Sequence, residues 1–136
     1  MQLSDLSSKI LNNTLPVIIS THQTPDGDAL GSEIALAHCL KKMGKEVILV
    51  NQDKTPVAFK FLEKYERIKS TAEIISVPEK AQVIIVDAHD IDTTGPDIKE
   101  LINAVKEKEI FFINHHSPKY FEPNYLYILF LSLIHI

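Results

Sequence analysis

Three groups of polar side chains have the residue types that bind metal ions or phosphate groups. The first is His22, Asp26 and Asp28, spaced as His-x-x-x-Asp-x-Asp around a proline and a glycine. Because proline and glycine favour a loop, the three side chains can face one point. Imidazole and carboxylate ligands without a thiolate suit Mn²⁺ best, with Mg²⁺, Co²⁺ and Zn²⁺ less favoured. The alternative is a common turn that caps the helix expected from Ala29.

The other two groups each follow an apolar run. Asp87 ends one run, where a carboxylate can bridge two metal ions or simply cap a turn. Asn114, His115 and His116 end the next run. Adjacent histidines on an extended chain point in opposite directions, so both reach one site only if the chain turns there. A polar cap on a buried strand is the alternative for this third group.

The elements that must position these groups alternate along the chain. Apolar, β-branched runs predict strands over 17–21, 47–50, 83–87 and 110–113. Helical spacing predicts helices over 4–13, 29–43 and about 96–106, with a short turn at 59–62. Residues 63–77 predict no clear element. The alternation predicts an α/β fold, a mostly parallel sheet flanked by helices, and ligands bind beyond the carboxyl ends of such strands.

Composition limits the partners of this chain. Its 136 residues are 45% hydrophobic and carry a net charge of −4. An acidic chain disfavours long duplex nucleic acid, which prefers a basic surface, but allows small anions held by metal ions. The single cysteine, Cys39, excludes an internal disulfide, and its apolar helical setting predicts a buried structural thiol. With neither a signal sequence nor the ~20 apolar residues of a membrane helix, we expect a cytoplasmic protein without a membrane partner.

The DHH phosphoesterase family has a first motif that is very similar to residues 18–32 of this chain, IISTHQTPDGDALGS. The Gly44 helix end, the pair Phe61-Leu62, the strand end at Asp87 and the doubled histidine are also typical of that family. The likeness covers nearly all of residues 15–121. It is strongest to the branch with bacterial oligoribonucleases, 3′-phosphoadenosine-5′-phosphate phosphatases and cyclic-dinucleotide hydrolases. The resemblance implies a Rossmann-like DHH domain.

The resemblance also implies roles for the site residues. It assigns two Mn²⁺ ions, with Mg²⁺ or Co²⁺ as substitutes, to five ligands: His22 and Asp26 for one ion, Asp28 and His115 for the other, and Asp87 as the bridge. His116 would contact the phosphate, so His116 and Asp87 are the catalytic candidates. Water activated between the two ions would attack phosphorus in line. The implied substrate is a short oligonucleotide or small nucleotide, and a homodimer is left open.

Three features depart from the family pattern. Asn114 stands where the family has an aspartate that orients a ligand histidine, and such changes typically cost ~10–100-fold in affinity or activity. An arginine that commonly follows the third-strand aspartate is absent, so the substrate phosphate would lose a bidentate contact. The family also continues with a further metal-binding aspartate and a second, substrate-binding domain.

These departures shape the expected domain organisation. We expect residues 1–124 to be a DHH-type catalytic domain, incomplete at its carboxyl end, without the second domain. The apolar residues 125–136 are either an added strand or a truncated or misread coding end, and we favour an incomplete chain. Two functions follow. The first is a Mn²⁺-dependent phosphoesterase, and the alternative is a weak or inactive nucleotide- or metal-binding module, or an incomplete fragment of such an enzyme.

Overall fold

The computed structural model describes residues 3–114 and the backbone of residues 125–129. In that part of the chain, parallel strands form one sheet in the order β3-β2-β1-β4-β5-β6. The strands are β1 (Val17–Ser20), β2 (Val47–Asn51), β3 (Lys69–Ser70), β4 (Lys80–Val86), β5 (Glu107–Asn114) and β6 (Tyr125–Leu129). The prediction of an α/β fold with a mostly parallel sheet is confirmed.

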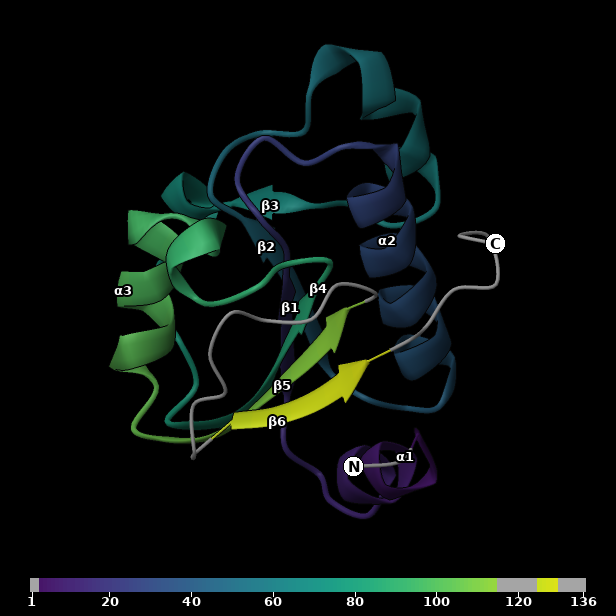
Figure 1. The fold of residues 1–136 in the computed structure, drawn as a ribbon, viewed down its shortest axis with the longest axis vertical. Helices are drawn as coiled ribbons and strands as arrows, with labels where there is room; N and C mark the ends of the chain where they lie inside the picture. Colours follow the sequence, from purple (N-terminus) through teal and green to yellow (C-terminus); the bar gives the residue numbers. More distant parts are fainter. Residues whose placement is uncertain (1–2, 115–124, 130–136) are drawn as a thin grey trace.

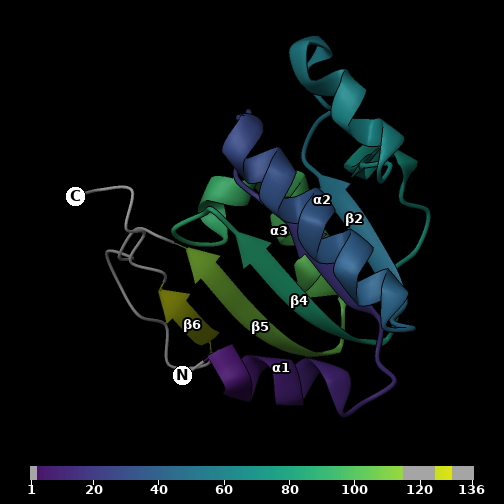
Figure 2. The same ribbon diagram turned by 90° about the vertical axis from the view of Figure 1, so that its right-hand side faces the viewer.

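Helices cover both faces of this sheet. Helices α1 (Leu3–Leu11) and α2 (Gly27–Lys42) pack on one face, and α3 (Pro96–Ala104) packs on the other, as Figure 1 and Figure 2 show. Short 3-10 helices lie in the connections: η1 (Val57–Lys64), η2 (Thr71–Glu73) and η3 (Asp92–Thr94). Among the described residues, no helix combines the length and the apolar character needed to cross a membrane.

Two apolar layers hold the helices on the sheet. Because successive strand residues point to opposite faces, Ile19 and Ile84 pack with α1 and α2, whereas Ile18 and Ile85 pack with α3. All four side chains are at most 1% exposed. Each such burial contributes about 1.5–3 kcal/mol. Strands β1 and β4, which lead to two of the predicted site groups, are therefore firmly packed on both faces.

The order of the strands creates a natural binding position. From β1 the chain runs outward to β2 and β3, then returns to the other side of β1 to form β4. Strands β1 and β4 pair in parallel, from Val17 opposite Gln82 to Ser20 opposite Ile85. Their following loops diverge at this point, and open α/β sheets bind ligands at such a crevice. His22 follows β1 and Asp87 follows β4, so both lie at the switch point.

Some element boundaries differ from the sequence-based prediction. Strands β4 and β5 begin at Lys80 and Glu107, ahead of their apolar runs, because their polar first residues pair with each other. Helix α2 begins at Gly27, ahead of the expected residue 29. Strand β3 and η2 lie in the segment 63–77, where the sequence predicts no element. A strand of two residues is too short to show a period in the sequence.

The prediction that Cys39 is a buried structural thiol is wrong, since this side chain is exposed. The buried stripe of α2 contains Leu30, Ile34, Ala37 and Leu40, spaced by three and four positions. Cys39 stands two positions after Ala37, which is about 200° around a helix with 3.6 residues per turn. The apolar composition of the helix alone does not show that Cys39 lies outside its buried stripe.

The apolar segment 125–136 contains a strand in the described part. The backbone of β6 pairs with β5 from Ile110 to Asn114. The expected domain boundary at residue 124 and the origin of the segment stay predictions.

Candidate metal centre

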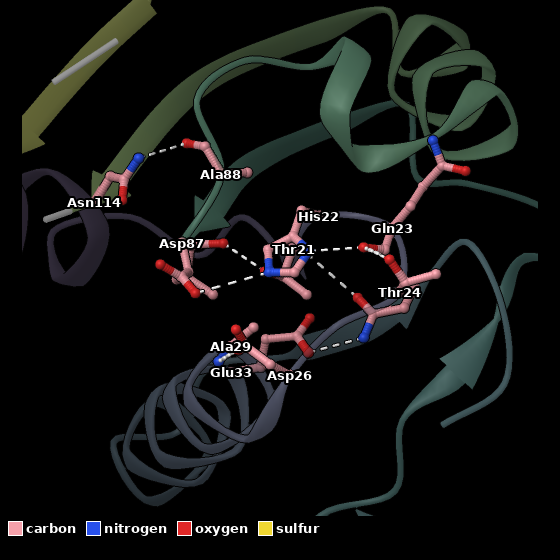
Figure 3. Close-up of polar contacts among 12 residues, drawn as sticks. Thr21, His22, Gln23, Thr24, Asp26, Ala29, Glu33, Asp87, Ala88 and Asn114 are labelled. Carbon is pink, nitrogen blue, oxygen red and sulfur yellow. Dashed lines mark hydrogen bonds and ion pairs between the residues drawn. The ribbon is translucent and has the colours of Figure 1, made fainter. Parts of the chain in front are cut away.

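His22, Asp26 and Asp87 lie together at the carboxyl ends of β1 and β4. One ligand atom from each side chain lies within 4.8 Å of the others. Nε2 of His22 is 3.8 Å from Oδ2 of Asp87. Figure 3 shows these side chains pointing toward one another from the loop after β1, the start of α2 and the end of β4. His22 and Asp87 are half-buried and Asp26 is exposed, so the group is open to solvent on one side.

The ring of His22 is held with one nitrogen toward Asp87. Nδ1 of His22 is 2.7 Å from the carbonyl oxygen of Gln23. A carbonyl oxygen only accepts, so Nδ1 carries the proton of that contact. In the neutral ring, Nε2 then has the lone pair that a metal ion needs, and second contacts of this kind fix the tautomer of ligand histidines.

Asp26 has two tasks. It is the N-cap of α2, and the N–H of Ala29 donates to Asp26 Oδ1 over 2.9 Å. The sequence left a turn that caps the helix and a metal ligand as alternatives, but the structure makes them compatible. The cap engages one carboxylate oxygen and fixes the orientation of the group, because a carboxylate has a second oxygen that can face a cation.

Asp87 has an unusual backbone conformation. Its φ is 52°, in the left-handed region that few non-glycine residues adopt, although aspartate is among the residues enriched there. The N–H of Asp87 donates to the carbonyl oxygen of Ile113 over 3.0 Å, which holds the turn against β5. Strain of this kind concentrates at functional sites. Here it directs the carboxylate toward His22.

Further hydrogen bonds join the two loops. Thr21 Oγ1 donates to the carbonyl oxygen of Val86 over 2.7 Å. The N–H of Gln23 donates to the carbonyl oxygen of Thr93 over 2.8 Å. The residues on both sides of His22 are therefore fixed, Thr21 to the end of β4 and Gln23 to η3.

Asp28 is not a member of the group formed by His22, Asp26 and Asp87. It is exposed in the first turn of α2. It lines a cavity of about 540 Å³ together with Asp87 and Asn114, and the rest of this lining is mainly apolar. Asp28 therefore lies on the cavity side of Asp87, and its role as ligand of a second ion stays a prediction.

Asn114 is buried at the end of β5, and its Nδ2 donates to the carbonyl oxygen of Ala88 over 3.1 Å. The amide thus joins the end of β5 to the turn after Asp87. The sequence predicts that Asn114 also orients a ligand histidine. His115 and His116 lie outside the described residues, so that role and their assignment to metal and phosphate stay predictions.

The sequence reasoning missed a buried polar network below the site. Glu33 of α2 is 0% exposed, and Asn51 Nδ2 donates to its Oε2 over 2.8 Å. Burial raises the pKa of Glu33 well above its usual value, and the bond from Asn51 offsets only part of this effect. The sequence does contain a signal for the burial of Glu33, because this residue stands three positions after Leu30 and four before Ala37, on the buried stripe of α2.

Comparisons with known proteins point to one family. Residues 16–133 match the DHH family, N-terminal domain. The chain is 31% identical over 102 residues to the bifunctional oligoribonuclease and PAP phosphatase NrnA of Thermus thermophilus, covering 75% of this chain and 28% of that protein. It is 29% identical over 108 residues to a probable manganese-dependent inorganic pyrophosphatase of Enterococcus faecalis, covering 78% of this chain and 33% of that one.

A solved structure supports the fold. An exopolyphosphatase-related protein from Bacteroides fragilis aligns with a TM-score of 0.70 and 20% identity, over 91% of this chain and 37% of that one. The chain thus spans about a third of the length of the proteins it matches. Since the family match covers most of its residues, the chain belongs to the DHH family.

Proposed function

We propose that this chain forms the catalytic domain of a metal-dependent phosphoesterase that hydrolyses short oligonucleotides or small nucleotide phosphates. The observation that carries the proposal is the convergence of His22, Asp26 and Asp87 at the switch point of the sheet. The relatives support it, because one is named for oligoribonucleotides and PAP and the other for pyrophosphate. All these substrates contain a bond from phosphorus to oxygen that water can cleave.

The donor set fits a hard or borderline divalent cation. One imidazole and two carboxylates without a thiolate are typical ligands of Mn²⁺, which the name of the pyrophosphatase relative also gives. We assign His22, Asp26 and Asp87 to a first ion, and Asp28 with His115 to a second ion that shares Asp87. The chemistry that such ions supply when bound is activation of water and neutralisation of charge on the phosphate oxygens.

The residues of the chain would hold the ligand side chains in the orientation that the cation needs. Nδ1 of His22 is engaged by the carbonyl of Gln23, which leaves Nε2 for the cation. The cap contact with Ala29 and the bond from Asp87 N–H to Ile113 fix the two carboxylates before a ligand arrives. Side chains that are already held in place lose little conformational entropy when a ligand binds, so less of the binding free energy is spent on ordering them. His116 would contact the phosphate of the substrate.

The experiment is a hydrolysis assay of the purified chain with Mn²⁺. The substrates are a diribonucleotide, PAP and inorganic pyrophosphate, and the product is followed by chromatography or phosphate release. We expect Mn²⁺-dependent hydrolysis of the diribonucleotide or PAP, its loss in Asp87→Asn, and its retention in the matched control Asp90→Asn. Equal activity in both variants would contradict the assignment of Asp87.

The second candidate function is a metal- and nucleotide-binding module without hydrolysis. Asn114 favours it, because a neutral amide bonded to the carbonyl of Ala88 replaces the carboxylate that the family has at this position. Mn²⁺ binding by calorimetry without hydrolysis of any of the three substrates would select this candidate over the enzyme.

A further inference from the structure

Glu33 is a fully buried carboxyl group that the proposed chemistry does not use. Its side chain is 0% exposed in the face of α2 that packs on the sheet. Its Oε2 accepts a bond from Asn51, and its Oε1 has no partner among the described residues. Burying a polar atom without a partner opposes folding. An apolar side chain would fill this space without that cost, so packing alone does not call for a carboxyl group here.

Asn51 links Glu33 to the end of β1, the strand that leads to the site. Asn51 Oδ1 accepts from Ser20 Oγ and from the N–H of Thr21, each over 3.3 Å. Thr21 is the last residue before His22, and Figure 3 shows Glu33 below this pair. A bond from Thr21 to β4 then ends one residue before Asp87. The network therefore connects α2, β2, β1 and β4 directly beneath the candidate ligands.

The direction of each bond sets the role of Glu33 as an acceptor. Asn51 Oδ1 is committed to the donors of β1, so its Nδ2 group is the part that faces Glu33. Glu33 then serves as an acceptor that prevents the amide of Asn51 from turning over. Either form of the carboxyl group can accept this bond, and burial raises the pKa of Glu33, which favours the neutral form.

We propose that Glu33 is a positioning residue whose carboxyl group holds Asn51 and thereby sets the place of His22 relative to Asp87 before a cation binds. This inference rests on the proposed function, because that function assigns His22 and Asp87 to the cation. The hydrogen bond of Glu33 is with Asn51 and not with His22, Asp26 or Asp87. Residues that orient ligands from behind typically change metal affinity by about 10–100-fold when they are altered.

Two variants of Glu33 test this role. Glu33→Gln keeps an oxygen that accepts from Asn51 and removes the ability to ionise, whereas Glu33→Met keeps the volume and removes the acceptor. We expect Glu33→Met to bind Mn²⁺ about tenfold more weakly in calorimetric titration, and Glu33→Gln to bind like wild type. The matched control is Glu100→Gln on the exposed face of α3. Glu33→Leu, which likewise removes the acceptor, replaces Glu33→Met if that variant does not fold.

Hydrogen exchange of the Thr21 amide gives a second readout that needs no metal. Because this N–H donates to Asn51, we expect faster exchange at Thr21 relative to Ile19 in Glu33→Met, and no change in Glu33→Gln. A purely structural role would lower the melting temperature of Glu33→Met but leave both Mn²⁺ affinity and the relative exchange of Thr21 unchanged, which would overturn the proposal. Equal losses in both variants would overturn it too. If wild type binds no Mn²⁺, the proposed function fails, and Thr21 exchange alone decides the positioning role.

Discussion

His22 and Asp87 face each other across the switch point of the sheet, with Nε2 of His22 3.8 Å from Oδ2 of Asp87. The proton of the neutral imidazole is engaged on Nδ1 by the carbonyl oxygen of Gln23. Two acceptors therefore point at each other, and neither can donate to the other. Either a proton on Nε2 or a cation between the two groups resolves this conflict, and the nearby carboxylate of Asp26 adds a third acceptor for a cation.

The first prediction concerns stabilisation of the fold by Mn²⁺. A ligand that binds only the folded state at 100 times its Kd adds about 2.7 kcal/mol to the free energy of unfolding. We expect thermal unfolding of wild type to move to higher temperature with Mn²⁺, and expect His22→Ala to lose most of that shift. His89→Ala is the control, because His89 is exposed and outside the ligand group. Equal shifts in the two variants would count against the site.

The second prediction separates the two tasks of Asp26. Removing the side chain in Asp26→Ala deletes the cap of α2 and is expected to cost about 1 kcal/mol of stability without metal. Asp26→Asn keeps an oxygen that accepts from Ala29 and should unfold like wild type in chelator. Both variants should bind Mn²⁺ more weakly, because both lose the carboxylate charge. Chemical denaturation in chelator and calorimetric titration with Mn²⁺ measure the two effects, and full Mn²⁺ affinity in Asp26→Asn would show that the residue only caps the helix.

The sequence is most informative where the fold follows from a simple geometric rule. His22 and Asp87 each follow an apolar run, and parallel strands bring their carboxyl ends to one edge, so their meeting was predictable. The conformation of Asp87 was not, because its positive φ depends on a bond to β5 that forms only in the folded protein. For the same reason, the sequence could not show that the cap at Asp26 and the ligand group coexist.

Residues on α2 show the limit of composition as a guide. Cys39 and Glu33 both lie in an apolar helix, and the residue types suggest that the thiol is buried and the acid is exposed. The structure has the reverse, because the angular position on the helix decides burial. Glu33 stays on the inner face because Asn51 gives it a partner there. That partner lies on another strand, which a helical pattern cannot reveal.

The third prediction tests whether a second ion binds. Asp28 lines the cavity beside Asp87, outside the group of Asp26 and His22. We expect calorimetry to give two Mn²⁺ ions for wild type and one for Asp28→Ala, with the first affinity largely retained. Asp53→Ala on an exposed turn is the control. A stoichiometry of two in Asp28→Ala would exclude Asp28 as an essential ligand of the second ion.

The fourth prediction concerns the amide of Asn114. Its Nδ2 donates to the carbonyl of Ala88, but an ionised aspartate can only accept, so Asn114→Asp places two acceptors together in a buried position. We expect a loss of about 1–3 kcal/mol in chelator. In Mn²⁺, a charged acceptor beside the ligand histidine should tighten binding by about tenfold, ~1.4 kcal/mol. Denaturation and calorimetry measure these opposite effects, and unchanged or weaker Mn²⁺ binding would remove Asn114 from the role of orienting a ligand.

The last prediction concerns the pH dependence that Glu33 imposes on stability. Burial raises the pKa of Glu33 in the folded protein above the 4.5 usual for a glutamate. Below the pKa that Glu33 has in the unfolded chain, both the folded and the unfolded state hold the proton, and the contribution of Glu33 to stability is complete. As pH rises above that value the unfolded chain releases the proton but the folded chain keeps it, so stability falls until the folded pKa is passed.

Glu33→Gln removes this dependence, because glutamine does not ionise. We therefore expect the stability of Glu33→Gln relative to wild type to rise as pH increases from about 5 to 8. Glu66→Gln is the matched control, because Lys41 lowers the pKa of Glu66 from the usual 4.5, so its contribution is lost only as pH falls below this range, and the stability of Glu66→Gln relative to wild type should stay constant across it. Chemical denaturation of the three proteins across this range, in chelator, measures the slopes. A constant difference between Glu33→Gln and wild type would mean that Glu33 is ionised in the fold, and the acceptor contact with Asn51 would then be that of a carboxylate.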